Sequence, residues 1–200
     1  MLAAMTEERF LADLLANRYN RAILQAWDAL ELADGWLVAG SLFQTVWNLQ
    51  AGRAPEDGIL DCDVFYFDAS DLSEQAEARV QQRVDCVLGN LGVPVEVKNQ
   101  ARVHLWYEQH FGFPYPQLAS AQDGIDRFLV PSTCVGVRRV DSAYEVYAPN
   151  GLALLYAGVL APNPLTWHLP LFRQKAASYR RRWEWLQVRE PAASDDSQSL

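Results

Sequence analysis

Two acidic side chains lie two residues apart in the segment 59–68, which is rich in residues that favour β-strands. Because side chains alternate across a strand, Asp61 and Asp63 are expected to face the same side, roughly 6–7 Å apart at the backbone. Two ionised carboxylates on one face repel each other unless a cation lies between them. The spacing therefore indicates a metal site.

A third acidic side chain, Glu96, lies in the next expected strand, over 93–98. Its valine neighbours would point to the core, so Glu96 and Lys98 would share the opposite face. If the two strands are adjacent, Glu96 can join the same site. Three carboxylates and substrate phosphate oxygens suit Mg²⁺ or Mn²⁺, which prefer oxygen ligands. The predicted metal-binding and catalytic residues are Asp61, Asp63 and Glu96.

The pair Gly40-Ser41 ends a short apolar run that begins at Trp36, and a helix is expected to follow. Glycine lets a phosphate approach the backbone closely, and the first amides of a helix are free to bind it. Ser41 fits a phosphate donor and an ordinary helix N-cap equally well. Downstream, Lys98 and Arg102 could bind phosphate, although Lys98 could instead pair with Glu96.

Taken singly, an Asp-x-Asp pair also fits a solvated strand, and a Gly-Ser pair also fits an ordinary turn. Their order along the chain, from Trp36 to about Lys98, resembles the DNA polymerase beta-like nucleotidyltransferase superfamily. This resemblance implies a small mixed sheet with helices packed on it and a two-metal transfer of a nucleotidyl group. In that comparison Gly40-Ser41 matches the phosphate-holding element. Asp61 and Asp63 match the metal-binding pair, and Glu96 falls at the third carboxylate.

A closer resemblance is to an uncharacterised bacterial nucleotidyltransferase-like family formerly labelled a domain of unknown function. It is carried by the segments 44–48, 61–68 and 99–107 and covers most of the chain, up to about Pro164. The implied activity is transfer of a nucleoside monophosphate from a nucleoside triphosphate such as ATP to an unidentified hydroxyl acceptor. The alternative is a catalytically silent module with the same fold that binds a nucleotide or a protein partner, in an antitoxin-like or regulatory role.

The elements expected around these residues are those of an α+β fold: a small mixed β-sheet with packed helices, and helical N- and C-terminal elements. We expect a single domain over 1–190, with N-terminal helices in 6–33, a core in 36–112 and a C-terminal part in 120–188. Residues 191–200 are expected to be a disordered tail. Other expected helices span 71–91, 101–110, 124–130 and 171–186, and further strands span 135–140 and 144–147.

The chain has 200 residues, a formal net charge of −8 and 50% hydrophobic residues, which is typical of a globular protein. The negative charge makes long nucleic acid an unlikely partner, because binding it depends on Lys and Arg. Three scattered cysteines indicate reduced thiols and a cytoplasmic location. The apolar stretch 152–161 is about half the length of a membrane span, so no membrane partner is expected.

Overall fold

The computed structural model describes residues 7–166 and 168–190. Five strands in this part of the chain form one sheet, in the order β3-β2-β1-β4-β5. They are β1 (Trp36–Val38), β2 (Cys62–Tyr66), β3 (Val95–Asn99), β4 (Gly136–Val140) and β5 (Ala143–Tyr147). β2 and β3 are parallel, and the other neighbours are antiparallel. The predicted α+β fold with a small mixed sheet is confirmed.

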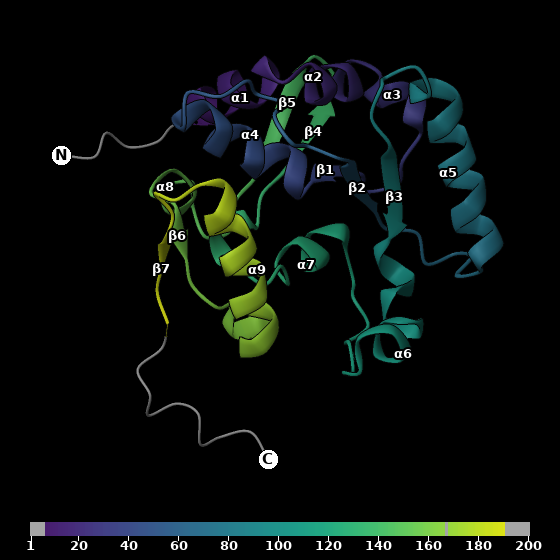
Figure 1. Ribbon diagram of the computed structural model, residues 1–200. Helices are drawn as coiled ribbons and strands as arrows, with labels where there is room; N and C mark the ends of the chain where they lie inside the picture. Colours follow the sequence, from purple (N-terminus) through teal and green to yellow (C-terminus); the bar gives the residue numbers. More distant parts are fainter. Residues whose placement is uncertain (1–6, 167, 191–200) are drawn as a thin grey trace.

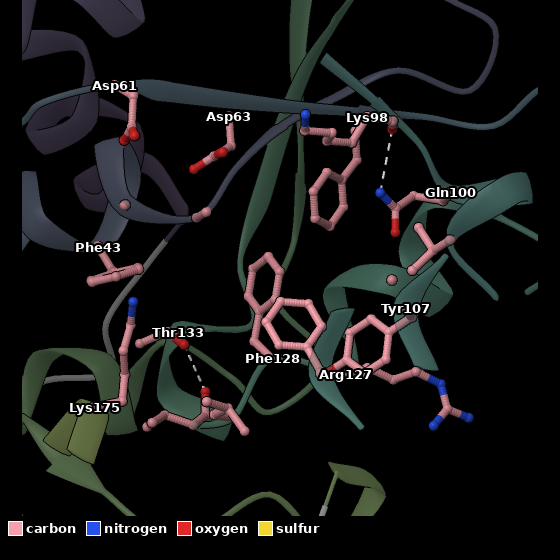
Figure 2. A pocket seen from close by; sticks show the side chains of 18 of the residues that line it. Phe43, Asp61, Asp63, Lys98, Gln100, Tyr107, Arg127, Phe128, Thr133 and Lys175 are labelled. Carbon is pink, nitrogen blue, oxygen red and sulfur yellow. Dashed lines mark hydrogen bonds between the residues drawn. The ribbon is translucent and has the colours of Figure 1, made fainter. Parts of the chain in front are cut away.

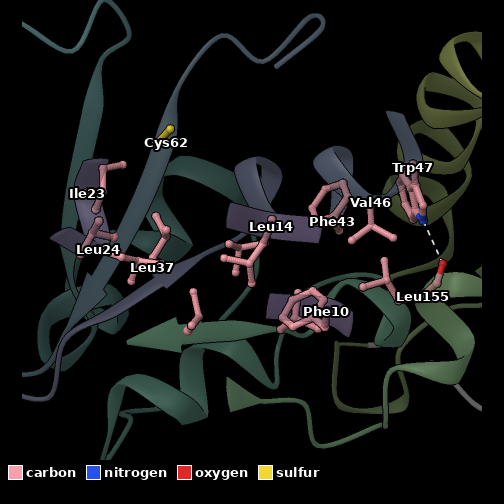
Figure 3. Packing of buried hydrophobic residues seen from close by; sticks show 14 of the residues in the cluster. Phe10, Leu14, Ile23, Leu24, Leu37, Phe43, Val46, Trp47, Cys62 and Leu155 are labelled. Atoms are coloured by element: carbon pink, nitrogen blue, oxygen red, sulfur yellow. Dashed lines mark hydrogen bonds between the residues drawn. The ribbon is translucent and has the colours of Figure 1, made fainter. Parts of the chain in front are cut away.

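One face of the sheet is covered by helices from the first half of the chain. These are α1 (Glu7–Ala16), α2 (Arg18–Gln25), α3 (Trp27–Leu30), α4 (Gly40–Gln50) and α5 (Glu74–Leu88). Alternate strand residues such as Leu37 and Val64 meet helix residues such as Phe10 and Leu14 in the main core (Figure 3). This burial of apolar area is the main contribution to stability.

The opposite face of the sheet is covered over part of its area by α7 (Ala121–Ile125). Trp36 and Val38 of β1 pack there against Ala121 and Ile125 in a second, smaller cluster. The short α6 (Tyr107–Phe111), α7 and α9 (Leu169–Arg182) lie on the lower side of the molecule in Figure 1, away from α1 and α2.

The remaining described elements are short and connect these layers: η1 (Gln100–Leu105), η2 (Pro131–Thr133), α8 (Ala153–Tyr156), β6 (Val159–Leu160), η3 (Pro164–Thr166) and β7 (Gln187–Val188). β6 and β7 form a separate parallel pair. No helix in the described ranges is long and apolar enough to span a membrane. Each of the three cysteines is unpaired.

The C-terminal helix α9 is fixed against α4 by aromatic packing and buried hydrogen bonds. The rings of Trp47 and Trp183 pack edge to face, with centroids 5.3 Å apart. The indole of Trp183 donates to Asn48 Oδ1 at 3.0 Å, and that of Trp47 donates to the carbonyl of Leu155 at 3.0 Å (Figure 3). Arg182 donates to Gln44 of α4 and to the carbonyl of Asp57. The position of α9 relative to α4 is therefore determined at several points.

Several boundaries differ from the expected ones for local reasons. β2 begins at Cys62, so Asp61 lies just before the strand rather than in it. The helix expected over 124–130 is instead α7, over 121–125, because the hydroxyl of Ser120 caps it by accepting from the amide of Asp123. The helix expected over 101–110 divides into η1 and α6. The expected tail, 191–200, lies outside the described residues, and the limits of the expected domain stay a prediction.

Candidate active site

A cavity of about 550 Å³ lies on the second face of the sheet, bordered by α4, α6, α7 and α9. Asp61 and Asp63 both line this cavity and point into it (Figure 2). Asp61 is exposed and Asp63 is partly buried. The structure therefore brings together the two aspartates on which the predicted site depends.

The third predicted carboxylate, Glu96, lies beside this pair but outside the cavity lining. It is the register partner of Asp63 across the parallel strands β2 and β3, so the two side chains share a face. The Glu96 side chain is 52% exposed, and its carboxylate lies 3.7 Å from the ammonium of Lys98. β2 and β3 are thus adjacent and Glu96 shares the face of Asp63, as expected, while the Glu96 carboxylate itself is paired with Lys98.

Negative charge is concentrated at Asp63. Burial, together with the nearby Asp61 and Glu96, raises the pKa of this carboxyl to about 6, while Lys175 and Lys98 partly oppose the shift. A carboxylate in this state favours a bound cation, which would relieve the repulsion. Within the described ranges, no group of three or more Asp, Glu, His or Cys side chains lies close enough together to hold a metal ion. A magnesium ion here would therefore take further ligands from water or from substrate phosphate, as this ion commonly does.

The turn between β1 and α4 forms another part of the cavity wall. Ala39 has a φ of 58° and a ψ of −137°, a conformation that is strained for a residue with a Cβ, and both Ala39 and Gly40 line the cavity. The amides of Leu42 and Phe43 donate to the carbonyl of Ala39, so a phosphate at this turn would be bound by the amides that precede them. Ser41 is fully buried, and its hydroxyl lies beside the Cys62 thiol on the core side of β2. Gly40, but not the Ser41 side chain, therefore faces the predicted site.

The two predicted basic residues differ in their surroundings. Lys98 lines the cavity, as expected for a phosphate-binding residue. Arg102 does not: its guanidinium donates to the carboxylate of Glu77 at 2.5 Å and to the carbonyl of Leu72 at 3.2 Å. The Arg102 side chain is only 9% exposed. In this structure Arg102 connects η1 to α5 and lies away from the cavity, contrary to the expected nucleotide contact.

A family model described as nucleotidyltransferase matches residues 25–188 of the chain. The chain belongs to this nucleotidyltransferase family. A solved structure described as "The NMR structure of the protein reveals a CCA-adding enzyme head domain" is similar over 93% of this chain and 97% of that chain, with a TM-score of 0.75 and 24% identity. At that identity the likeness concerns the fold. No curated protein matches the chain. The family predicted from sequence is confirmed.

In this nucleotidyltransferase family member, α9 contributes a cavity residue that the sequence analysis missed. Lys175 lines the cavity, and its side chain extends toward the two aspartates (Figure 2). Arg182 of the same helix donates instead to Gln44 and to the carbonyl of Asp57. A usable signal was the rarity of lysine: the chain contains only Lys98 and Lys175, and both line the cavity.

Aromatic rings line the cavity at the end away from Asp61. Tyr107 and Tyr115 have ring centroids 4.3 Å apart, and Phe65 and Phe128 pack edge to face at 5.6 Å. The guanidinium of Arg127 lies 5.8 Å from the centre of the Tyr115 ring. Flat apolar walls with a nearby cation can accommodate a planar ring, as in other small-molecule sites. The sequence showed an aromatic turn after residue 110 but gave no reason to place it in the site.

Gly40→Val is expected to weaken nucleoside triphosphate binding by at least about tenfold and to reduce stability much less. A Cβ at Gly40 would lie 2.5 Å from Nε2 of Gln44, so that side-chain end must shift at the cost of its hydrogen bond from Arg182. The branched side chain would in addition obstruct the approach of phosphate to the backbone. Calorimetric titration with Mg²⁺ and ATP measures the affinity, and thermal melting measures the stability. Unchanged affinity in a folded Gly40→Val variant would exclude this turn as a phosphate contact.

Proposed function

We propose that this chain is a metal-dependent nucleotidyltransferase that transfers a nucleoside monophosphate from a nucleoside triphosphate to a hydroxyl acceptor. The observation that carries the proposal is the pair Asp61 and Asp63 in one cavity, with the pKa of Asp63 raised to about 6. Membership of the nucleotidyltransferase family supports the reaction class, and the similarity of fold supports the positions of the strands.

Asp61 and Asp63 would hold Mg²⁺ or Mn²⁺, and Glu96 is proposed as the third carboxylate of a two-metal site. Glu96 shares the face of Asp63, and it would exchange its contact with Lys98 for the metal. When bound, the metal supplies charge neutralisation at phosphate and a lower pKa for the attacking hydroxyl. Glu96 would also accept the proton that this hydroxyl loses.

The other cavity residues would bind and orient the substrate. The backbone amide of Gly40 would donate to the polyphosphate. Lys98, released from Glu96, would add a positive charge. Holding the reacting groups in line in a partly enclosed cavity is the principal way in which such sites accelerate phosphoryl chemistry. The acceptor is left open: the net charge of −8 favours a small molecule or a protein hydroxyl over long RNA.

The proposed function is tested by incubating the protein with a nucleoside triphosphate labelled at the α-phosphate. Mg²⁺ or Mn²⁺ is included, and the acceptor panel holds small hydroxyl compounds, proteins and short RNA with a free 3′-hydroxyl. Metal-dependent transfer of label with release of pyrophosphate is the expected result. Metal-dependent nucleotide binding without transfer to any acceptor in the panel, and without pyrophosphate release, would favour the catalytically silent module. Absence of metal-dependent nucleotide binding would refute both.

Metal binding is expected to weaken as the pH falls through about 6. The raised pKa of Asp63 means that protons compete with the metal below this value, so apparent affinity should fall by up to about tenfold per pH unit. Mn²⁺ without nucleotide is the appropriate probe, because phosphate itself titrates near pH 6. The Mn²⁺-dependent increase in melting temperature, measured from pH 5 to 8, should be largest above pH 7. An increase of equal size at pH 5 and 8 would rule out Asp63 as the titrating ligand.

A further inference from the structure

The cavity has two chemically different ends, with Asp63 between them (Figure 2). Asp61, Phe43 and Lys175 lie on one side of Asp63 in this view, and Tyr107 and Arg127 lie on the other. All of these side chains line the same cavity. A ligand long enough to reach from one end to the other would therefore meet the two aspartates and the Lys175 ammonium at one end, and the Tyr107 ring with the Arg127 guanidinium at the other.

Lys175 provides the positive charge at the first end. Its ammonium lies 5.5 Å from the centre of the Tyr179 ring, and no carboxylate of the described ranges forms an ion pair with it. Lys98, by contrast, is engaged by Glu96. The backbone of Lys175 is fixed because the neighbouring turns of α9 bury Phe172, Ala176 and Tyr179 in the main core. A compact ammonium on a fixed helix suits the charge of a phosphate.

The aromatic end has the opposite character. Tyr107 stacks at an interplanar angle of 35° on Tyr115, and α6, which carries Tyr107, has no buried residue. Phe128 also lines the cavity and packs edge to face against Phe65. Rings of this kind stack on nucleobases with little preference between bases, since every base has a π-face.

We propose that the nucleotide lies along the cavity with its polyphosphate at Lys175 and Gly40 and its base against Tyr107 and Phe128. This inference rests on the proposed function and adds the orientation of its substrate. The reverse orientation would place the phosphates against aromatic faces, with Arg127 as the cation at that end, and would leave the Lys175 ammonium and the metal-binding aspartates beside a neutral base. Recognition of the base by stacking also predicts weak discrimination among ATP, GTP, CTP and UTP.

The test compares two ligands, magnesium tripolyphosphate and magnesium ATP, by calorimetric titration of the full chain and its variants. Lys175→Met should weaken binding of both ligands by about tenfold or more, and Lys175→Arg should restore most of the loss. Tyr107→Ala should weaken ATP by about fivefold or more, the lower limit for one base stack, and leave tripolyphosphate unchanged. Arg180→Gln is the matched control: it removes one positive charge from the same helix outside the cavity lining, and neither affinity should change.

Phe128→Leu provides a second test of the aromatic end that keeps apolar volume if Tyr107→Ala unfolds. Orientation is overturned if Lys175→Met leaves tripolyphosphate binding intact, or if the aromatic variants weaken both ligands equally while remaining folded. Equal losses in Lys175→Met and Arg180→Gln would show a general charge effect and would also overturn it. If the wild-type chain binds neither ligand with Mg²⁺, the proposed function itself fails. If the wild-type chain transfers nucleotide and the variants bind both ligands as the wild type does, only the proposed orientation is refuted.

Discussion

Asp63→Asn is expected to reduce metal-dependent nucleotidyl transfer by at least about 100-fold, because it removes a ligand of the metal that neutralises transition-state charge. Asparagine keeps the size and shape of the side chain, so the cavity should be unaltered. The variant should also lose most of the increase in melting temperature that Mg²⁺ and ATP give the wild-type protein. That increase follows RT ln(1 + [L]/Kd), and a weaker Kd makes it smaller.

The same substitution is expected to leave the metal-free protein as stable as the wild type, or more stable. The pKa of Asp63 is raised in the folded state, so the native protein binds this proton more readily than the unfolded chain does. Ionisation of Asp63 therefore costs stability as the pH rises from about 4 through 6, and the full cost is present at pH 7. The neutral amide does not incur this cost. Unfolding in urea at pH 7, without metal, measures the difference.

Asp68→Asn is the matched control, since Asp68 lies in the same segment with a shift of opposite sign. Hydrogen bonds from Ser70 hold the pKa of Asp68 below its usual value. The ionised carboxylate of Asp68 therefore stabilises the folded state at any pH above the usual pKa of an aspartate. Its replacement should leave metal-free stability equal or slightly lower and leave the metal-dependent increase in melting temperature intact. A wild-type protein without any metal-dependent increase at saturating ATP, or an Asp63→Asn variant with a full increase, would show that this face is only solvated surface.

Arg102→Met is expected to lower the free energy of unfolding by about 3 kcal/mol, as breaking one side of a largely buried ion pair does. Glu77, whose side chain is only 17% exposed, would keep its charge without the guanidinium. The carbonyl of Leu72 would lose its donor as well. For a chain of this size, the loss corresponds to a decrease of roughly 6–12 °C in melting temperature.

Thermal melting and ATP titration together separate the two roles considered for Arg102. A structural role gives a lower melting temperature and unchanged ATP affinity below the transition, whereas a nucleotide contact gives the reverse. Arg79→Met is the control: Arg79 pairs with Asp71 at 3.1 Å, but both side chains are well exposed, so the loss should stay below about 1 kcal/mol. Equal changes in melting temperature for the two variants would contradict the structural role.

The sequence predicted the acidic centre well because strand alternation is a local property. Asp63 and Glu96 face the same side, as the pattern required, and Asp61 points into the same cavity although it lies outside β2. The ion pair between Glu96 and Lys98 was one of the alternatives left open. These outcomes depend on neighbours within one strand or on adjacent strands, which periodicity can describe.

The residues that sequence reasoning misplaced or missed depend on contacts between distant segments. Arg102 follows the acidic strand, but the sequence could not show that Glu77 of α5 would take its guanidinium. Lys175 reaches the site because ring packing and hydrogen bonds from Trp183 and Arg182 fix α9 against α4. Both residues of the Gly-Ser pair were predicted to bind phosphate. Successive residues at a turn point in different directions, however, and the Ser41 side chain faces the core.

The attachment of α9 to α4 has a consequence for synthesis. The two aspartates emerge from the ribosome long before Lys175, and N-terminal segments generally fold first. The acidic pair is therefore formed before the helix that carries its opposing charge, and the wall that Lys175 and Tyr179 supply is added last. A chain interrupted before residue 169 would lack Lys175 and keep Lys98 as the lysine near the two carboxylates. Lys175 can thus contribute its charge to the cavity only after synthesis has passed α9.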